Sequence, residues 1–312
     1  MKKTRVLIID DSATMRGLIA AALKRDPDIE VLGFANDPIE AREQIKKLNP
    51  DVVTLDIEMP RMDGLTFLAR LMKHYPLPVI VVSSLTPAGS EAAMRALELG
   101  ALDVISKPGA AYSVGDVAVQ LIDRIRAAAL ARVRRPAEAT APRSAAGTLS
   151  AIHATDKILA IGASTGGTEA IREVLEALPA TTPATVIVQH MPEQFTAAFA
   201  RRLNDLCAME VREAAGGELL RPGLALIAPG NHHLLITRQG AQYFAQIKDG
   251  PRVHHQRPAV DVLFNSVAKY AGVNAVGVLL TGMGADGAAG LLAMRQAGAR
   301  TIAQDQATCV VY

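Results

Sequence analysis

Short apolar runs alternate with longer segments of helical periodicity along residues 5–122. In the longer segments, apolar residues recur three and four positions apart, which is typical of amphipathic helices. The apolar runs are continuous rather than alternating, and this pattern indicates strands that are buried on both faces. Five strand–helix units are therefore predicted, as in a doubly wound five-stranded parallel sheet. The predicted strands are Arg5–Ile9, Ile29–Ala35, Val52–Leu55, Pro78–Val82 and Asp103–Ile105, and the predicted helices are Ser12–Arg25, Pro38–Leu48, Gly64–His74, Ser90–Leu99 and Val114–Ala131.

A change in composition separates this pattern from a second one. Residues 124–147 are almost all Ala, Arg, Pro and small polar residues, which favours an extended linker after Pro136. After residue 155 the alternation resumes, and a hairpin is predicted near Gly240. Strands are predicted at Lys157–Ile161, Thr185–Val188, His233–Thr237, Gln242–Ile247, Leu224–Ala228 and Ala275–Leu280, and helices at Thr168–Leu178, Pro192–Asp205, Val260–Tyr270 and Ala288–Ala297.

These patterns predict three parts of the chain. Residues 1–122 form the five-stranded parallel domain, and residues 123–152 form the linker. Residues 153–312 form a second α/β domain with a mainly parallel sheet and a β-hairpin. Two domains suit a chain of 312 residues, because single cores rarely grow beyond about 250–300 residues.

Composition excludes several classes of protein. The 33 Lys and Arg residues against 31 Asp and Glu leave a charge of +2, and aromatic residues make up only 4%, so we expect no nucleic-acid partner. No run approaches the roughly 20 apolar residues of a membrane span, and Val6–Ile9 is too short for a signal peptide, so we expect no membrane insertion. The two cysteines, Cys207 and Cys309, suit a cytoplasmic protein without disulfides.

Polar residues of the first domain follow the predicted strands. Asp10 and Asp11 end the first strand and Asp56 the third, while Ser83 and Lys107 follow the fourth and fifth. The carboxyl ends of parallel strands form the ligand crevice of such a sheet. Converging carboxylates need a hard cation such as Mg²⁺, and a lysine and a hydroxyl opposite them suit a phosphoryl group. Helix capping is the alternative role for Asp11 and its neighbours.

This part of the chain resembles a two-component receiver domain. The resemblance covers residues 1–122 and is carried by Val6–Ser12, Asp56–Gly64, Ser83 and Lys107-Pro108. It implies that Asp56 is the phosphoacceptor and that Asp11, Asp56 and the carbonyl of Glu58 bind Mg²⁺, supported by Asp10. It also implies that Ser83 and Lys107 bind the phosphoryl group and that the Lys107–Pro108 bond is cis. Receivers often carry an aromatic residue where this chain has Val104, which departs from their usual switch.

Residues of the second domain suggest nucleophilic catalysis. Gly162–Gly166 has the pattern G-x-S-x-G, which lifts a serine hydroxyl on a turn between strand and helix. A nucleophilic serine needs a base and a group that orients the base. Ser164, His190 and Asp286 each lie just beyond a predicted strand, so one rim of the sheet would carry all three.

Other histidines and carboxylates compete with this interpretation. Asp261 and Asp305 are alternatives to Asp286 for the orienting role, although neither lies in a Gly-rich turn. The pairs His232-His233 and His254-His255 could each supply one ligand to a zinc site, but adjacent residues on a strand point to opposite faces. Positions on the surface or on a pocket wall are favoured for them.

The second domain is similar to the chemotaxis protein-glutamate methylesterases of the CheB family. The similarity runs from residue 156 to the end and is carried by Ile161–Gly167, Gln189–Met191, Ala228–His233, Arg257–Asp261 and Leu280–Gly287. It implies hydrolysis of glutamate methyl esters on methyl-accepting chemoreceptors, with methanol released, and deamidation of glutamines. Ser164 would be the nucleophile, His190 the general base and acid, and Asp286 the orienting carboxylate, while backbone N–H groups at Met283 and Thr165 would bind the oxyanion. No cofactor is expected for ester hydrolysis.

The receiver resemblance implies that a chemotaxis histidine kinase donates the phosphoryl group and that phosphorylation activates the hydrolase. The alternative function is a phosphorylation-dependent binding module without catalysis. That alternative needs a phosphate-binding residue near Ser164, and the sequence offers none there. It also leaves His190 and Asp286 without a role.

The end of the chain departs from the family pattern. Thr301–Ala303 and Ala307–Tyr312 are predicted as strands with no helix after them, whereas the family continues through a final helix. An uncovered apolar sheet loses about 25 cal/mol for each Å². We therefore expect the 312-residue form to be less stable and more prone to aggregation than a longer one.

Overall fold

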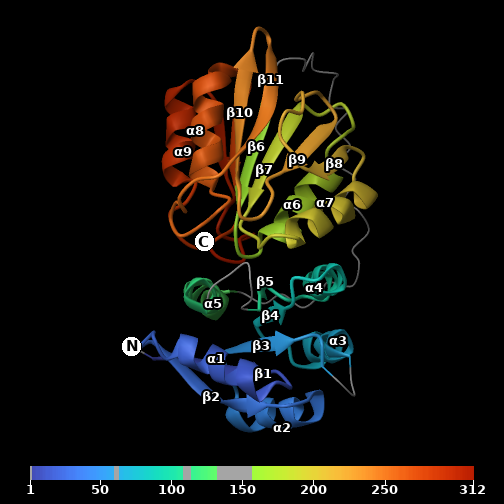
Figure 1. Cartoon of the computed structure of the whole chain (residues 1–312), viewed down its shortest axis with the longest axis vertical. Helices are drawn as coiled ribbons and strands as arrows, with labels where there is room; N and C mark the ends of the chain where they lie inside the picture. The colour runs from blue at the N-terminus through green and yellow to red at the C-terminus, as the bar shows by residue number, and fades with distance from the viewer. Residues whose placement is uncertain (1, 60–62, 108–113, 132–156) are drawn as a thin grey trace. The chain divides into compact units, whose positions relative to one another are not determined.

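The computed structural model describes residues 2–59, 63–107, 114–131 and 157–312, and it divides the chain into two compact α/β units between residues 139 and 140 (Figure 1). The helix α5 (Val114–Leu130) continues past residue 123, where the linker was predicted to begin. Most of the predicted linker lies outside the described residues, so its boundaries stay a prediction.

The first unit is built around a five-stranded parallel sheet with strand order β2-β1-β3-β4-β5. This confirms the predicted doubly wound sheet. The helix α1 packs beside α5, and α3 packs beside α4. The strands are β1 (Thr4–Ile9), β2 (Ile29–Ala35), β3 (Val52–Asp56), β4 (Val79–Ser83) and β5 (Asp103–Ser106), and the other helices are α1 (Ala13–Leu23), α2 (Pro38–Leu48), α3 (Gly64–His74) and α4 (Pro87–Glu98).

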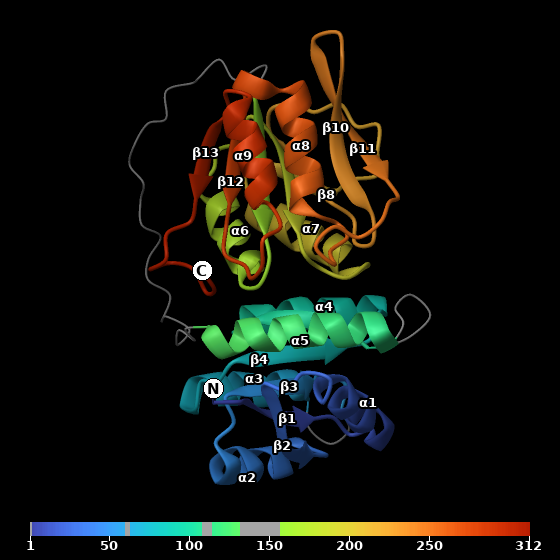
Figure 2. The same ribbon diagram turned by 90° about the vertical axis from the view of Figure 1, so that its left-hand side faces the viewer.

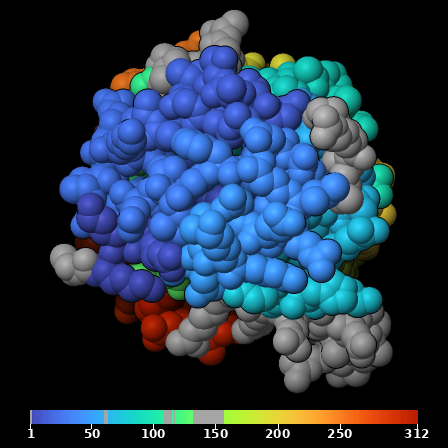
Figure 3. Space-filling view, turned by 90° about the horizontal axis from the view of Figure 1, so that it is seen from below, coloured from blue at the N-terminus to red at the C-terminus, as the bar shows by residue number. Residues whose placement is uncertain are grey.

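The central strands of the first sheet form a buried core. All five residues of β3 and of β4 are buried, as expected for continuous apolar runs. The helix α4 begins at Pro87, earlier than predicted, because the Thr86 side chain accepts the Gly89 N–H at 3.0 Å and caps the helix. Seen from the end where α2 lies, the surface of this unit is continuous (Figure 3).

The second unit contains a six-stranded parallel sheet with strand order β13-β12-β6-β7-β9-β8 and a separate antiparallel hairpin, β10–β11. The predicted parallel sheet and hairpin are thereby confirmed. The strands are β6 (Ile158–Ala163), β7 (Ala184–Gln189), β8 (Glu210–Glu213), β9 (Leu224–Ile227), β10 (His233–Gln239), β11 (Gln242–Lys248), β12 (Ala275–Leu279) and β13 (Arg300–Ala303), and the helices are α6 (Gly167–Glu176), α7 (Phe195–Leu206), α8 (Val260–Tyr270), the 3₁₀ turn η1 (Gly272–Asn274) and α9 (Ala288–Gln296).

Helices cover both faces of the second sheet. The pair α6 and α7 lies on one face, and the pair α8 and α9 lies on the other (Figures 1 and 2). Phe264 of α8 is fully buried among side chains of the sheet, of α9 and of the hairpin. The hairpin packs on α8, and side chains of the hairpin, of α8 and of the sheet share one hydrophobic core.

The two edges of the second sheet differ from what the sequence predicts. Ala307–Tyr312 was predicted as a strand, and this is wrong: Asp305 Oδ1 accepts the N–H groups of Ala307 and Thr308, which fold this segment into a turn. The edge strand β8, with the sequence EVRE, was not predicted, because it is short and charged. At the other edge, Ile302 of β13 is 54% exposed.

The described helices include none that is both long and apolar enough to cross a bilayer.

Candidate active site and acidic pocket

Three adjacent strands of the second sheet bring together the serine, histidine and aspartate selected from the sequence. Ser164 follows β6 and His190 follows β7, while Asp286 lies in the loop between β12 and α9. The order β12-β6-β7 makes these strands neighbours, so their carboxyl ends share one rim of the sheet. All three side chains are largely buried there.

The imidazole of His190 links the other two side chains. Its Nδ1 lies 3.1 Å from Ser164 Oγ, and its Nε2 lies 2.7 Å from Asp286 Oδ2. An ionised carboxylate can only accept hydrogen bonds, so the network assigns a proton to Nε2 and leaves Nδ1 as the acceptor that faces the serine hydroxyl. This is the tautomer that a general base for serine requires.

Asp286 is fixed by the first turn of α8 as well as by His190. Its Oδ2 accepts the Val260 N–H at 2.7 Å, and its Oδ1 accepts the Asp261 N–H at 2.9 Å. Burial raises the pKa of Asp286, but the hydrogen bond and charge of His190 and these two N–H groups outweigh burial and hold the pKa below its ordinary value. The carboxylate therefore stays ionised. No pattern in the sequence predicts this contact with the helix, because it depends on tertiary packing.

The turn that carries Ser164 is packed closely against the loop after β12. The Ser164 N–H donates to the carbonyl of Thr281 at 3.0 Å. Gly282 lies directly against Ser164, since a Cβ at this position would lie 2.6 Å from Ser164 Cβ. Gly166 adopts a φ of +77°, which side chains other than that of glycine rarely allow. The glycines of both motifs thus position the serine.

Two polar residues that the sequence analysis did not select also brace this turn. Gln189 is buried, and its amide donates to the carbonyl of Ser164 at 2.9 Å. The Thr281 hydroxyl donates to the carbonyl of Thr165 at 3.1 Å. Gln189 and Thr281 both lie within sequence motifs that carry the family resemblance. Those motifs were the only feature of the sequence that pointed to these two residues.

The two predicted oxyanion positions lie beside Ser164. Thr165 follows it on the turn and is buried, and Met283 follows Gly282, the residue in contact with Ser164. Their role toward a substrate stays a prediction.

Asp261 and Asp305, the alternatives to Asp286 for the orienting role, make other hydrogen bonds and ion pairs. The Asp261 side chain accepts the Gly290 N–H at 2.6 Å and lies 3.2 Å from Nε2 of His254. Asp305 bonds within its own turn at residues 305–308. Asp286 is thus the carboxylate in contact with His190.

The two histidine pairs do not meet in a shared metal cluster within the described residues. His232 lies 2.5 Å from Asp249 near the surface. His233 is buried, with Nδ1 accepting the Ala259 N–H and Nε2 facing the Pro251 carbonyl. His233 therefore serves the packing of the hairpin rather than metal binding.

In the first unit, the structure gathers the predicted pocket at the carboxyl ends of β1, β3 and β5. Lys107 Nζ lies 2.6 Å from Asp56 Oδ2 and 3.9 Å from Asp10 Oδ2. Burial lowers the pKa of Lys107, but the hydrogen bond and charge of Asp56 and the charge of Asp10 raise it overall, so the lysine stays charged.

The carboxylates of this pocket fit a divalent cation. Oxygens of Asp10, Asp11 and Asp56 lie within 4.8 Å of one another, and Asp10 Oδ2 is buried without a hydrogen-bond partner. Burial, with the charges of Asp56 and Asp11, raises the pKa of Asp10 to about 6, against the Ser12 N–H and Lys107, which lower it. A cation would remove this repulsion, and an all-oxygen set is what Mg²⁺ prefers.

The remaining predicted residues border the pocket. The Glu58 N–H donates to Asp56 Oδ1 at 3.0 Å, and the buried Ser83 hydroxyl donates to the Gly89 carbonyl at 3.2 Å. Val104 is buried within β5. The predicted cis bond at Lys107–Pro108 involves a residue outside the described ones.

Comparison with known proteins matches each unit to a family. Residues 159–312 match the CheB methylesterase family, and residues 6–114 match the response regulator receiver domain. A protein-glutamate methylesterase/protein-glutamine glutaminase of Syntrophus aciditrophicus (strain SB) is 58% identical over all of this chain and 92% of its own length. A protein of the same name from Salmonella typhi is 55% identical over all of this chain and 89% of its own length. Both resemblances are thereby confirmed.

Solved structures of Thermotoga maritima are similar to parts of the chain. The CheB methylesterase catalytic domain is 38% identical over 50% of this chain and 83% of its own, with a TM-score of 0.49. The response regulator domain of CheB is 44% identical over 41% of this chain and 97% of its own, with a TM-score of 0.38. Because relatives of 55–58% identity match it along its whole length, the chain belongs to the CheB methylesterase family, with a response regulator receiver domain before the esterase domain.

Proposed function

We propose that this chain is a phosphorylation-activated hydrolase that demethylates glutamate methyl esters on methyl-accepting chemoreceptors, releasing methanol, and that also deamidates glutamines. The observation that carries the proposal is the chain of hydrogen bonds Ser164–His190–Asp286 at the rim of the second sheet. The names of the relatives, protein-glutamate methylesterase/protein-glutamine glutaminase, support the choice of substrate.

In the proposed reaction, Nδ1 of His190 accepts the hydroxyl proton of Ser164 while Oγ attacks the ester carbonyl carbon. The Nε2–H bond to Asp286 keeps the ring in this orientation and stabilises its positive charge. Backbone N–H groups of Thr165 and Met283 would bind the oxyanion, and such a donor typically contributes about 3–4 kcal/mol to the barrier reduction.

The bond between carbonyl carbon and methoxy oxygen then breaks. His190 gives its proton to the leaving methoxide, so methanol departs and an ester with Ser164 remains. Water attacks this ester with His190 as base, which restores the serine and releases the glutamate carboxylate. With a glutamine substrate, ammonia leaves in place of methanol.

The receiver unit supplies the regulation in this proposal. Asp56 accepts a phosphoryl group from a chemotaxis histidine kinase, and Lys107 and Ser83 bind its oxygens. Asp11, Asp56 and the Glu58 carbonyl would hold Mg²⁺, with Asp10 supporting them. When bound, Mg²⁺ neutralises negative charge during phosphoryl transfer.

The free thiols of Cys207 and Cys309 fit a cytoplasmic location, where disulfides are rare.

Methanol release from methylated chemoreceptor, with and without a small-molecule phosphodonor, tests the whole proposal. We expect release that rises with the phosphodonor and disappears in Ser164→Ala. A serine-directed fluorophosphonate probe separates this proposal from a binding module without catalysis, because only an activated serine reacts. An unlabelled Ser164 and absent methanol would favour the binding module.

A further inference from the structure

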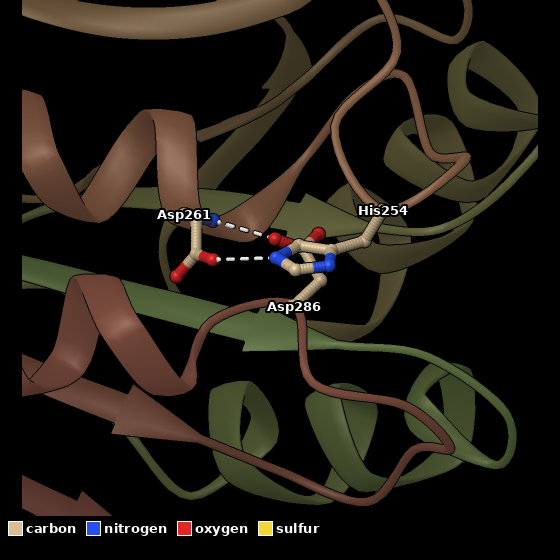
Figure 4. Close-up of side chains that lie close together, drawn as sticks. All are labelled: His254, Asp261 and Asp286. Carbon is tan, nitrogen blue, oxygen red and sulfur yellow. Dashed lines mark hydrogen bonds and ion pairs between the residues drawn. The ribbon is translucent and has the colours of Figure 1, made fainter.

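A second group of side chains that could hold a metal ion includes the carboxylate of Asp286. It consists of His254, Asp261 and Asp286, whose ligating atoms all lie within 4.8 Å of one another. His254 comes from the loop before α8, Asp261 from the first turn of α8, and Asp286 from the loop before α9. Figure 4 shows the three side chains turned toward a common point.

The spacing of the first two ligands suits a small divalent ion. Nε2 of His254 lies 3.2 Å from Oδ2 of Asp261. Two ligands bound to one tetrahedral Zn²⁺ at about 2.0–2.1 Å lie about 3.3 Å from each other. A metal ion between these two atoms therefore needs little movement of either side chain.

The two carboxylates are held for this role by separate contacts. Oδ1 of Asp261 accepts the Gly290 N–H at 2.6 Å, so its Oδ2 is the oxygen turned toward His254. Asp286 accepts three hydrogen bonds, and a carboxylate offers about four acceptor sites, so it can still coordinate an ion. The His254 side chain is 46% exposed, which gives an ion a path from solvent.

We propose that His254, Asp261 and Asp286 form an inhibitory site for a divalent transition metal, with Zn²⁺ as the best match. One imidazole nitrogen and two carboxylate oxygens are a ligand set that Zn²⁺ accepts, whereas Mg²⁺ and Ca²⁺ prefer oxygen alone. Three protein ligands leave the fourth position to water. The inhibitory effect rests on the proposed esterase function.

Inhibition is expected because Asp286 would bind the metal ion while it also holds His190. A metal ion that binds its carboxylate withdraws negative charge from the hydrogen bond to His190 Nε2. The imidazolium formed during the reaction then loses part of its stabilisation, and the ring is less well oriented. We expect at least a tenfold loss of esterase turnover when the site is filled.

The loop that carries His254 offers a matched pair of variants. His254 and His255 are adjacent, both exposed, and both adopt positive φ values, +50° and +63°. Asparagine tolerates this conformation better than most residues, so His254→Asn and His255→Asn should both fold. Only His254 belongs to the cluster among the described residues.

Isothermal titration calorimetry of the full chain with Zn²⁺, in millimolar Mg²⁺ to fill the acidic pocket of the first unit, measures binding directly. We expect Zn²⁺ affinity to fall at least tenfold in His254→Asn and to stay unchanged in His255→Asn. In parallel, ester hydrolysis should be inhibited by Zn²⁺ in the wild type and His255→Asn but not in His254→Asn, and a chelator should restore it.

Equal Zn²⁺ affinity in His254→Asn and the wild type would overturn the site. Zn²⁺ binding at His254 without any inhibition would overturn its regulatory role. The calorimetric measurement does not depend on activity, so failure of the metal site and failure of the proposed esterase function give different results.

Discussion

Replacing Asp286 by asparagine removes the negative charge next to His190 and changes little else in volume. The amide has one oxygen and one NH₂ group, whereas both carboxylate oxygens accept N–H groups here. If the NH₂ takes the place of Oδ1 it faces the Asp261 N–H, and if it takes the place of Oδ2 it faces the Val260 N–H. Either placement sets two buried donors against each other.

Two consequences can be estimated for Asp286→Asn. An unsatisfied buried donor costs about 1–3 kcal/mol of unfolding free energy. The same type of substitution in a serine protease lowers turnover by about 10⁴, because the imidazole takes the wrong tautomer. At about 1.36 kcal/mol for each factor of ten, this is a loss of about 5.4 kcal/mol of transition-state stabilisation.

The stability difference between wild type and Asp286→Asn should also depend on pH. The folded pKa of Asp286 is lowered, so its ionised form stabilises the fold above the ordinary carboxyl pKa. This contribution is lost as pH falls through the folded pKa. The difference in unfolding free energy should therefore be largest near neutral pH and should shrink under acid conditions.

Methanol release at saturating substrate gives the turnover, and thermal or denaturant melts give the stability. Asp305→Asn is the matched control, because it makes the same chemical change in a turn without contact to His190. Near-wild-type turnover in Asp286→Asn, with the protein folded, would refute its orienting role. An equal loss of turnover in Asp305→Asn would refute the assignment as well.

Three other perturbations test the remaining parts of the site. Ser164→Ala and His190→Ala should each remove nearly all methanol release, and the double variant should be little worse, because groups that act as one unit are strongly non-additive. Gly282→Ala should lower turnover at least tenfold in the same assay, since its Cβ would lie 2.6 Å from that of Ser164. Unchanged turnover would show that the loop after β12 can move to make room for the methyl group. Deleting residues 1–147 should raise esterase activity measured without phosphodonor, by about 5–150-fold if the coupling is about 1–3 kcal/mol, and a slower fragment would show that the receiver does not restrain the esterase.

Local sequence patterns determined most of the elements of both units. Val52–Asp56 and Ala184–Gln189 form buried strands because a continuous apolar run in an α/β chain can be buried only when both faces of the sheet are covered. The helices Pro38–Leu48 and Val260–Tyr270 have the predicted bounds, since amphipathic periodicity is a local property. Parallel strands also explain why Ser164 and His190 could be placed at one rim from sequence alone.

Tertiary structure decided the features that depend on contacts between distant segments. The edge strand Glu210–Glu213 pairs with β9 although three of its four residues are charged, and the end of the chain turns at Asp305 instead of forming a strand. The strand order placed Asp286 rather than Asp261 against His190. Packing of α8 also supplied the N–H groups that hold Asp286 and brought His254 to Asp261. Such contacts leave no periodic signal in the sequence, because they join residues that are neighbours only after the chain has folded.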